Sequence, residues 1–535
     1  MTCTFQGCTN NKFAPHEECA LHCVKSNYQD DKLKGVLSEF YDLLKIYIAD
    51  FLATTSASTS STIHSLFSSS PSSYKRDLGI DFPQMIRDSD LNDEETRNLI
   101  RRTNTYDLII LSNIHFPDRK SRDSFDYFKL LKLFSGIHLI DCHLYIGDWQ
   151  VEDVSFFFEE CVFYNWFDIT PITMLSNDTN CLFSECEFKT KVRVSRIETN
   201  NIFEDSLFSG CSFKNLLRLE NSVFKKEPFL ELNEQSFVNT TLEIFNCTFE
   251  GVVKLNKIAV RSLQINDTNF LSSFEITNMK VESFLCINTE MQGVFNAFES
   301  HFSYAKFERV KFYDVADFEN AEFGEADKIV IASYPVTAIF RFVTFMTASN
   351  FKKVNFYYGL DFENVDLREQ PNFLKSNINP YNTNRETFRI IKYSFDSRGN
   401  TLEANRFFVQ EMKAFKSELK AYGSKRDVVV YYMNDLMSEF GGNYVRPIVW
   451  LIISLILYTM LLSFHDCYFD NYNYFLHPYF NTLSVYANSA ARNFLPFSRF
   501  LESKSGFEFI SLLFYIWFAI LIWQIVVAVK RHTQR

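Results

Sequence analysis

The chain has 535 residues, of which 59 are Phe and 12 are Cys, and its formal net charge is −11 at pH 7. An aromatic content of 17% with only 15 Gly and 12 Pro excludes a collagen-like chain and a chain that is disordered throughout. The acidic balance argues against a general binder of nucleic-acid backbones, which normally carries a basic surface.

Four cysteines and two histidines crowd the first 23 residues. The spacing C-x4-C, ten residues, then C-x2-H supplies two ligand pairs on short turns, as a tetrahedral zinc site needs. The predicted zinc ligands are Cys3, Cys8, Cys19 and His22. Cys23 could replace His22, and His16 is a further candidate. The segment 1–30 resembles the small zinc knuckles of bacterial and phage proteins, which implies a closed structural site. The alternative is a flexible tail with free thiols.

Residues 31–52 place apolar side chains at helical spacing and therefore predict an amphipathic helix. We expect this helix to cover one end of the repeat region that follows it, since solenoid ends need covering. A helix on a membrane surface is the alternative. Residues 53–75 form a linker rich in Ser and Thr, and residues 76–137 are a mixed lead-in to the repeats.

Phenylalanine recurs at a step of five residues, which fits neither the 3.6-residue period of a helix nor the two-residue period of a strand. Residues 301–323 show the step most clearly, at Phe302, Phe307, Phe312, Phe318 and Phe323. A chain that turns a right angle every five residues explains it. A second spacing of twenty, as from Phe163 to Phe183, indicates four such sides in each coil. Coils would then stack at the strand separation of ~4.8 Å.

The large ring and a small residue two positions before it are both expected to face the interior of the coil. Other predicted core rings are Phe183, Phe188, Phe203, Phe208 and Phe213. Six cysteines at or near the small position are expected to be buried free thiols, namely Cys142, Cys161, Cys181, Cys186, Cys211 and Cys247. The extra residue between Phe312 and Phe318 predicts a bulged corner. Residues 254–268 and 325–340 interrupt the pattern and predict bulges or projecting loops.

The segments "VADFENAEF" and "GLDFENVDL" resemble the pentapeptide-repeat family, whose pattern is a small residue, Asp or Asn, Leu or Phe, and two polar positions. The segments "SECEF" and "SGCSF" are similar to it as well. The resemblance covers residues 138–375. It implies a mainly β fold, namely a right-handed quadrilateral β-helix.

Residues 383–445 predict a helical neck, which a capping box opens with Thr383 at the cap and Glu386 three residues later. The neck resembles the one that joins pentapeptide repeats to a two-span tail in many bacterial membrane proteins. Residues 447–464 and 509–529 then form two uncharged apolar runs that are long enough to cross a bilayer as helices. The alternative is a pair of buried core helices.

Basic residues flank the outer ends of the two predicted spans, and the tail 530–535 is basic. The loop 465–508 between the spans carries three basic residues and four acidic ones, of which Glu508 is the last residue of the loop. The positive-inside rule therefore predicts cytoplasmic termini, a cytoplasmic solenoid and an extracytoplasmic loop. Reduced cysteines suit this placement. The resemblance implies a bacterial inner membrane.

Polar and apolar residues alternate within the loop 465–508, as in a re-entrant segment. The candidates for lining a pore are Asn481, Ser484, Asn488 and, in the second span, Gln524. The potassium filter sequence TVGYG is absent, and a pore would require a homo-oligomer because two helices cannot enclose one. An ordinary extracytoplasmic loop is the alternative.

The sequence contains no catalytic template such as G-x-S-x-G or H-E-x-x-H, so we expect a protein that is not an enzyme. Solenoids usually bind other molecules. The leading expectation is an inner-membrane-anchored protein whose cytoplasmic rod recognises a protein partner or a signal. The alternative is an oligomeric two-span channel or membrane-perturbing effector, gated by the rod in a stress or phage-defence response. Nucleic-acid mimicry is a third hypothesis, and both the membrane tether and the imperfect register argue against it.

Overall fold

The computed structural model describes residues 2–14, 16–25, 36–57, 82–88, 97–98, 108–118, 127–147, 149, 151, 153–169, 172–175, 177, 180–195, 201–325, 336–380, 382–422, 425–468, 487–488 and 507–533. The chain divides into two compact units. The first comprises residues 1–331, 337–358 and 364–377, and the second comprises residues 332–336, 359–363 and 378–535. The first unit is mainly β-strand and the second is mainly helix.

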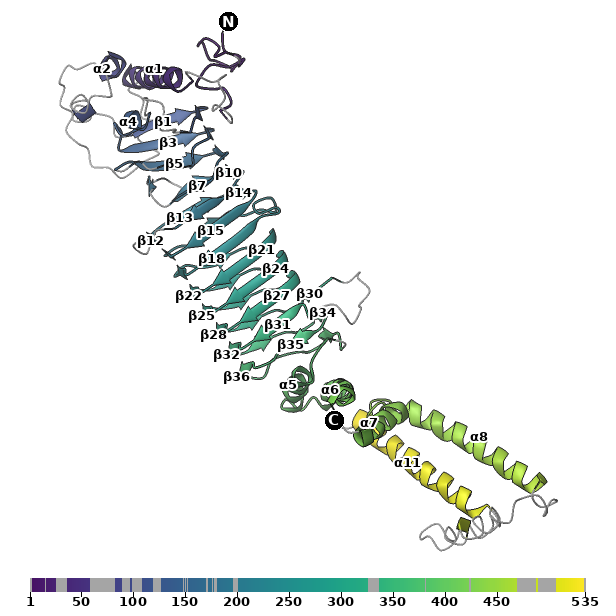
Figure 1. The fold of residues 1–535 in the computed structure, drawn as a ribbon. Coiled ribbons are helices and arrows are strands. Elements are labelled where there is room, and N and C mark those ends of the chain that lie inside the picture. Colours follow the sequence, from purple (N-terminus) through teal and green to yellow (C-terminus); the bar gives the residue numbers. More distant parts are fainter. Residues whose placement is uncertain are drawn as a thin grey trace. The chain divides into compact units, whose positions relative to one another are not determined.

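The first unit is a parallel β-solenoid of about ten turns, with its short strands stacked coil upon coil (Figure 1). Among the described residues the strands form five sheets. The first sheet contains β1 (Leu108–Ser112), β3 (Gly136–Ile140), β5 (Ser155–Glu159), β8 (Thr173–Met174), β9 (Cys181–Ser184), β13 (Ser206–Ser209) and β17 (Phe229–Leu230). The second contains β2 (His115–Phe116), β4 (His143–Leu144), β6 (Val162–Phe163), β10 (Glu187–Phe188) and β14 (Ser212–Phe213).

The three other sheets continue the solenoid towards higher residue numbers. One runs through β7 (Phe167–Asp168), β11 (Val192–Val194), β15 (Leu216–Glu220), β18 (Thr241–Phe245), β21 (Ala259–Asn266), β24 (Lys280–Ile287), β27 (His301–Glu308), β30 (Glu322–Phe323), β31 (Ala338–Arg341), β34 (Asn355–Phe356) and β37 (Asn377–Ile378). Another runs through β12 (Asn201–Phe203), β16 (Ser222–Phe224), β19 (Thr248–Phe249), β22 (Asn269–Phe270), β25 (Glu290–Met291), β28 (Lys311–Phe312), β32 (Thr344–Phe345) and β36 (Asp366–Leu367). The last contains β20 (Val253–Lys254), β23 (Phe274–Glu275), β26 (Phe295–Asn296), β29 (Ala316–Asp317) and β33 (Ser349–Asn350).

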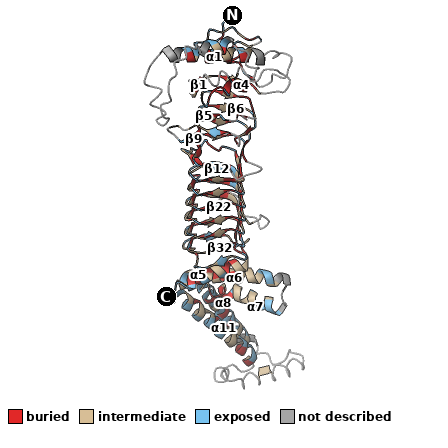
Figure 2. Cartoon of the chain, turned by 90° about the vertical axis from the view of Figure 1, so that its left-hand side faces the viewer, coloured by how far each residue is buried: buried red, intermediate tan, exposed pale blue. Residues whose placement is uncertain are grey.

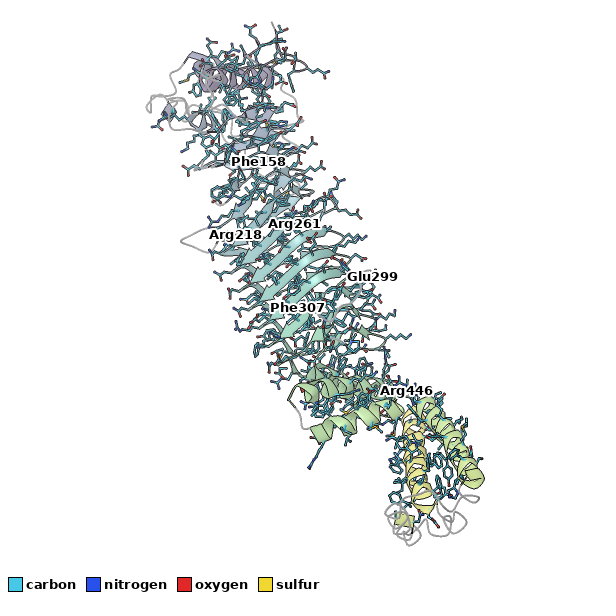
Figure 3. The ribbon with its side chains drawn as sticks, turned by 45° about the vertical axis from the view of Figure 1, so that its right-hand side comes forward. Phe158, Arg218, Arg261, Glu299, Phe307 and Arg446 are labelled. Carbon is cyan, nitrogen blue, oxygen red and sulfur yellow. The ribbon has the colours of Figure 1, made fainter. Side chains whose placement is uncertain are left out.

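The coil has four sides, as the five-residue step predicts. The strand β27 covers two of them, because its first half pairs with β30 and its second half pairs with β31. Aromatic rings fill the interior, where Phe158 and Phe307 point inward while Arg218, Arg261 and Glu299 point outward (Figure 3). The ribbon of the coils in Figure 2 alternates between buried and more exposed residues, as expected for side chains that point in and out in turn.

The predicted coil length of twenty residues is wrong. The register advances by 28 and then by 19 residues between the first coils, and next by 25, so that Phe163 pairs with Phe188 and not with Phe183. In the middle coils it advances by 21, as from Val281 to Phe302 to Phe323, and near the end by 33 and 22. The value of 21 has a simple cause, because three sides of five residues are joined by one side of six.

The additional residue lies where the bulged corner was predicted. Residues 313–315 form a three-residue corner between β28 and β29, whereas only residues 309–310 separate β27 from β28. The longer corner recurs in the coils before it, since residues 271–273 and 292–294 occupy the equivalent places. The extra residue is therefore a regular part of each coil.

Residues 254–268 do not bulge out of the solenoid, in contrast to the prediction. Most of them belong to β21, which pairs in unbroken register with β18 and β24. Leu255, Ile258, Val260, Leu263 and Ile265 are buried in this segment. Aliphatic side chains occupy the interior positions that Phe occupies elsewhere, so a search for rings alone misses the repeat. Of the second interruption, 325–340, residues 326–335 lie outside the described part of the chain.

Residues in the left-handed backbone region turn one corner of every coil. Asn246, Asp267 and Asn288 adopt φ values of 48°, 50° and 49°, which short polar side chains tolerate best. The small residue that follows donates a hydrogen bond back to the carbonyl two residues before it. Thr268 Oγ1 lies 2.9 Å from the Asn266 oxygen, and Cys247 Sγ lies 3.3 Å from that of Phe245. This corner bond explains why Cys and Thr stand two positions before the ring.

The predicted burial of the six solenoid cysteines is confirmed. Besides Cys247, four of them make the same corner bond at distances of 3.3–3.4 Å, namely Cys142, Cys161, Cys186 and Cys211. Of the ten predicted core rings, nine are buried and Phe203 is partly buried. Phe203 still stacks on Phe224 with ring centroids 5.2 Å apart.

The solenoid begins earlier than the predicted residue 138, because β1 pairs with β3 in register from Leu108 onward. Three helices lie near this end, namely α1 (Val36–Ala57), α2 (Phe82–Asp88) and α4 (Phe128–Leu131). The Phe40 ring of α1 packs edge-on against Phe116 of β2 at 5.8 Å. The Tyr47 hydroxyl lies 3.2 Å from that of Ser112 in β1. The helix α1 therefore caps the first coils, as the sequence predicts (Figure 2).

The second unit contains β35 (Leu360–Asp361), α5 (Arg385–Asp396), α6 (Thr401–Tyr422), α7 (Lys425–Ser438), α8 (Val445–Tyr468) and α11 (Glu508–Thr533). The N-cap of α5 is Asn384, whose side chain accepts a hydrogen bond from the Thr387 amide at 2.8 Å. The predicted cap, Thr383, instead accepts a hydrogen bond from the Leu360 amide at 3.0 Å, because its hydroxyl points towards β35. Phe388, Ile391 and Phe395 form a buried apolar stripe along α5.

The helices α8 and α11 form a hairpin whose polar side chains bond to one another. The Tyr458 hydroxyl donates to Ser511 Oγ at 3.0 Å, and the Trp517 indole donates to Ser454 Oγ at 2.9 Å. Both helices are long and apolar enough to cross a membrane, with mean hydropathies of 2.2 and 2.5. Their exposed faces carry aliphatic residues such as Ile452, as lipid contact requires.

Candidate metal centre and the cavity beside it

The four predicted ligands converge at the N-terminal end of the first unit. The ligand atoms of Cys3, Cys8, Cys19 and His22 all lie within 4.8 Å of one another. The sulfurs of Cys8 and Cys19 are 3.8 Å apart, and His22 Nδ1 lies 3.4 Å from Cys19 Sγ and 3.7 Å from Cys3 Sγ. Three of the four side chains are buried, and that of Cys8 is partly exposed.

The spacing of these donors matches a tetrahedral metal ion. With metal–sulfur bonds of about 2.3 Å, two thiolates at the tetrahedral angle stand about 3.8 Å apart, and a thiolate and an imidazole stand slightly closer. The Cys8–Cys19 and Cys19–His22 separations agree with these values. Because all four positions are filled by protein atoms, such a site is closed and suits a structural role. The group could therefore hold a metal ion.

Short backbone turns bring the ligands together. The Cys3 amide donates to the Asn10 carbonyl at 2.9 Å and closes the first loop, in which Gly7 adopts a φ of 82°. The His22 amide donates to the Cys19 carbonyl at 3.0 Å, which places both ligands of the second pair on a single turn. The His22 ring stacks on Phe5 with centroids 4.1 Å apart, and this contact fixes the orientation of the ring.

Burial favours the uncharged forms of these side chains. Burial, with the neighbouring Lys25 charge as a smaller cause, lowers the pKa of His22 to about 4, so its imidazole is neutral at ordinary pH. Burial raises the pKa of Cys8 to about 12, to which the neighbouring Cys19 also contributes. A neutral imidazole is ready to bind a metal ion, whereas a thiol with a raised pKa must first release its proton.

The two alternative ligands do not belong to the group. Cys23 follows His22 but is not among the four converging side chains, and the same holds for His16. The Cys23 carbonyl accepts a hydrogen bond from Lys25 Nζ at 2.9 Å. The sequence alone could not separate these candidates, because spacing does not show which side chain of an adjacent pair faces inward.

Lys25 connects the cluster to α1, which covers the first coils of the solenoid. Its side chain is buried, its ammonium lies 5.2 Å from the centroid of the Phe40 ring in α1, and burial lowers its pKa to about 8. The Leu21 carbonyl also accepts a hydrogen bond from the His115 amide of β2 at 2.8 Å. The cluster, α1 and the first coils thus pack against one another, and we call these parts together the cap.

A cavity of about 420 Å³ opens between the cluster and α1. Its apolar lining comes from Phe5, Leu43, Ile46 and Phe51, and its polar lining includes Asn10, Asp50 and Asn113. Cys8 and His22 border it as well. The carboxylate of Asp50 pairs with Arg87 of α2. A mixed lining of this kind is typical of recognition sites.

The helical stripe of residues 31–52 predicted the helix that supplies part of the cavity lining, but it did not predict the cavity. The rest of the lining comes from residues 5–10, from Leu21 and His22 and from Ser112 and Asn113, and no local pattern indicates that these segments meet. A ladder of aromatic rings beside the cap was likewise not predicted. His115 stacks on His143 at 4.1 Å, and Tyr145 stacks on Tyr164 at 4.4 Å. Histidines spaced by 28 residues give no signal unless the coil length is known.

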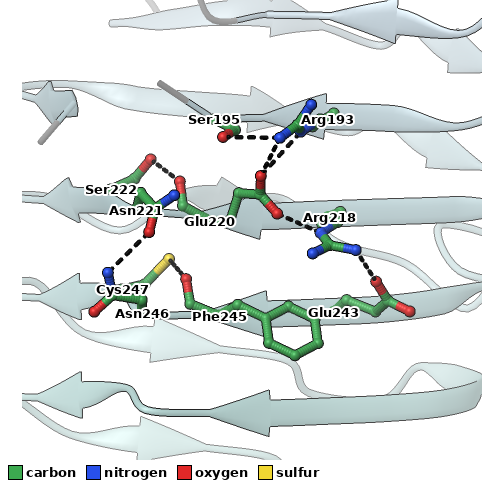
Figure 4. Close-up of polar contacts among 10 residues, drawn as sticks. All are labelled: Arg193, Ser195, Arg218, Glu220, Asn221, Ser222, Glu243, Phe245, Asn246 and Cys247. Carbon is green, nitrogen blue, oxygen red and sulfur yellow. Dashed lines mark hydrogen bonds and ion pairs between the residues drawn. The ribbon is translucent and has the colours of Figure 1, made fainter. Parts of the chain in front are cut away.

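The outer face of the solenoid carries ion-pair ladders between coils. Glu220 accepts hydrogen bonds from Arg193 of one neighbouring coil and from Arg218 of its own strand, and Arg218 reaches Glu243 of the next coil at 3.4 Å (Figure 4). Burial opposes ionisation of Glu220, but the hydrogen bonds from Arg193, Ser195 and Arg218 hold its pKa below the usual range. These residues lie in the sheet and stabilise its coils.

Of the predicted pore candidates, Asn481 and Ser484 lie outside the described residues. The Asn488 side chain accepts a hydrogen bond from the Phe509 amide at 2.9 Å, at the start of α11. The Gln524 carbonyl oxygen accepts a hydrogen bond from the Ser438 hydroxyl of α7 at 2.7 Å. The described candidates thus bond to backbone or side chains of their own chain.

Comparison with known protein families, with characterised proteins and with solved structures gives no match to this chain. Its function must therefore be argued from its own residues.

Proposed function

We propose that this chain is a non-enzymatic, membrane-anchored binding protein whose cap recognises a protein partner in the cytoplasm. The observation that carries the proposal is the cavity of about 420 Å³ between the cysteine–histidine cluster and α1. Apolar side chains and amide groups converge there on a rigid support. Solenoids generally act as such supports, because each coil is fixed by its neighbours.

We propose that α8 and α11 anchor the chain in a bacterial inner membrane with both ends in the cytoplasm. The internal pairing of Tyr458 with Ser511 and of Trp517 with Ser454 supports this placement, because buried polar groups in lipid need partners. The distribution of basic residues outside the apolar runs supports the orientation.

We propose that the solenoid belongs to the pentapeptide-repeat type. The four-sided coil, the inward ring and the small corner residue support this assignment. Coils of 21 residues depart from a strict multiple of five, and coils of 25 residues depart from four sides of five.

We propose that zinc is the metal of the cap. Three thiols and one imidazole at tetrahedral spacing form a donor set that zinc prefers. Bound zinc would supply cross-links to a segment that is too short to bury a core of its own. The turns at Cys3–Asn10 and Cys19–His22 hold the donors in position for it.

The internal hydrogen bonds of the hairpin favour an anchor over a pore. Gln524 pairs with Ser438, and the buried serines Ser454 and Ser511 bond to Trp517 and Tyr458 within the hairpin. Polar groups that line a pore would instead face water. We therefore propose an anchor and not a channel.

A photo-crosslinking amino acid at Ile46, on the rim of the cavity, tests the recognition site. Ile46 is 44% exposed, so the substitution leaves the core intact. We expect one adduct of defined mass from intact cells, reproduced with the purified partner, and loss of that adduct in the Cys19→Ser background. Ile202, which is 57% exposed on the solenoid wall, is the matched control position. Equal adducts at both positions, or none at Ile46, would contradict the proposal.

A further inference from the structure

We propose that α7 lies on the membrane surface, where Val429, Tyr432 and Leu436 contact lipid at the headgroup boundary. The proposal rests on the proposed anchoring by α8 and α11 and adds a second, peripheral contact with the same bilayer. Its partner is the anionic lipid surface.

The three side chains form one stripe along α7. They stand at positions i, i+3 and i+7, which place them on the same face of a helix. Their exposed fractions are 62%, 51% and 41%, which are large for apolar residues on adjacent turns. Within the described part of the second unit, no helix packs over the stripe as a whole, although the Lys416 ammonium of α6 lies 4.6 Å from the centroid of the Tyr432 ring.

The opposite side of α7 is occupied by protein. The Tyr431 ring packs edge-on against Phe415 of α6 at 5.2 Å. The Ser438 hydroxyl donates to Gln524 of α11 at 2.7 Å, and Lys416 of α6 pairs with Asp435. These contacts fix the rotation of α7 about its axis, so the stripe faces away from α11, with Lys416 of α6 at its edge beside the Tyr432 ring.

The contact with Gln524 sets the depth of α7. The helix α11 has 26 residues, so it is about 39 Å long and exceeds a hydrocarbon core of about 30 Å. Gln524 precedes the end of the apolar run, at Val529, by five residues or about 7.5 Å. The C-terminal end of α7 therefore meets α11 about 7.5 Å below the boundary between hydrocarbon and headgroups, within the depth of about 5–10 Å that interfacial helices reach.

The neighbouring side chains match that depth. Tyr444 and Trp523 are exposed by 44% and 66% beside the same end of the hairpin, and Tyr and Trp are enriched at headgroup level. Arg426 of α7 and Lys530 of α11 are exposed and can meet anionic headgroups. Asp427 is the acidic residue exposed on α7 and offsets one of these charges. The combination of apolar stripe, aromatic rim and cations fits a lipid surface better than a second copy of the chain.

A fluorescent amino acid at Val429 tests the contact in the full chain reconstituted into vesicles of phosphatidylcholine and phosphatidylglycerol. Lipids that carry a quencher just below the headgroups should quench this position at least about twofold more than a matched position. Leu402 of α6, exposed by 59%, is that matched control. Equal quenching at both positions would overturn the proposal. Quenching that requires a high protein-to-lipid ratio would assign the stripe to a second copy and would also overturn it.

A second variant separates this proposal from the anchoring on which it rests. In Leu436→Asp the charge should abolish the quenching at position 429, while the protein still floats with vesicles after alkaline carbonate treatment. Flotation without quenching in the unmodified chain would show that α7 does not touch lipid although the anchor holds. Loss of flotation would instead count against the anchor itself.

Discussion

At the level of single residues, Glu220 joins two coils of the solenoid wall, and its partner Arg218 reaches a third coil through Glu243. It accepts hydrogen bonds from Arg193 and Arg218, and its carboxylate is buried although both guanidinium groups are partly exposed. Replacing it by Gln removes the charge but keeps the shape. We expect Glu220→Gln to cost about 1.5 kcal/mol at pH 7, the low end for hydrogen bonds to charged groups. The thermal midpoint of near-UV circular dichroism measures this loss.

The same residue predicts a pH dependence. Because the pKa of Glu220 is lower in the fold than in the unfolded chain, its contribution is fully present above about pH 4.3 and declines as pH falls below that value. The difference between the two proteins should therefore shrink in acid. Glu204→Gln is the control, since Glu204 pairs with Lys225 at an exposed site and should change little. A constant difference from pH 7 to pH 3 would contradict this account.

At the scale of elements, the interior rings hold neighbouring coils together. Phe307 is fully buried and stacks on Phe340 with centroids 4.7 Å apart. Phe307→Ala should cost about 3–5 kcal/mol through lost contacts and a cavity. Hydrogen exchange should accelerate in β24, β27 and β31, which are the strands of the adjoining coils. Uniform acceleration along the whole solenoid would contradict a structure in which each coil depends on its neighbours.

Phe342 lies on the same solenoid wall, but its replacement should not destabilise the coils. Its ring is 53% exposed, and its backbone adopts a φ of 55° in the column of corners that Asn246, Asp267 and Asn288 occupy in other coils. A bulky residue is strained there, whereas Asn is not. Phe342→Asn should therefore keep or improve the protection of β31, which makes it a matched control for Phe307→Ala.

The coils, the cluster and the cavity differ in how far the sequence predicts them. The five-residue step indicated a four-sided coil because each side buries one ring and one small residue. The coil length was mispredicted. Rings five residues apart lie on different sides of the same coil and contact each other there, as Phe158 and Phe163 do at 5.6 Å, so the spacing of the rings alone does not show where one coil ends and the next begins. The spacing of the ligand pairs predicted the cysteine–histidine cluster, since its turns are local. The cavity beside it depends on contacts between α1 and β1, and no local pattern encodes those contacts.

In the first unit as a whole, a metal ion bound at the cluster should stabilise the cap and little beyond it. The cluster contacts α1 and the first coils through Lys25 and through the bond from His115 to Leu21. The coils after these are held by their own rings, and coupling in a solenoid passes only between neighbours. Loss of the metal should thus unfold the cap without unfolding the rod.

Hydrogen exchange on the full chain with Cys19→Ser, or after chelation, measures this directly. We expect at least about a hundredfold faster exchange in residues 16–25 and in α1, since structural zinc contributes most of the folding free energy of such segments. The effect should decline through β1 and β3 and vanish by β24, whose coil is distant along the stack.

Cys247→Ser is the control, because Cys247 is a buried thiol that makes a corner bond and touches no ligand. Acidification should mimic chelation, since protons compete with the metal for the thiolates. Unchanged exchange in residues 16–25 would mean that the cluster is packed without a metal, whereas faster exchange as far as β24 would mean that the cap supports the entire rod.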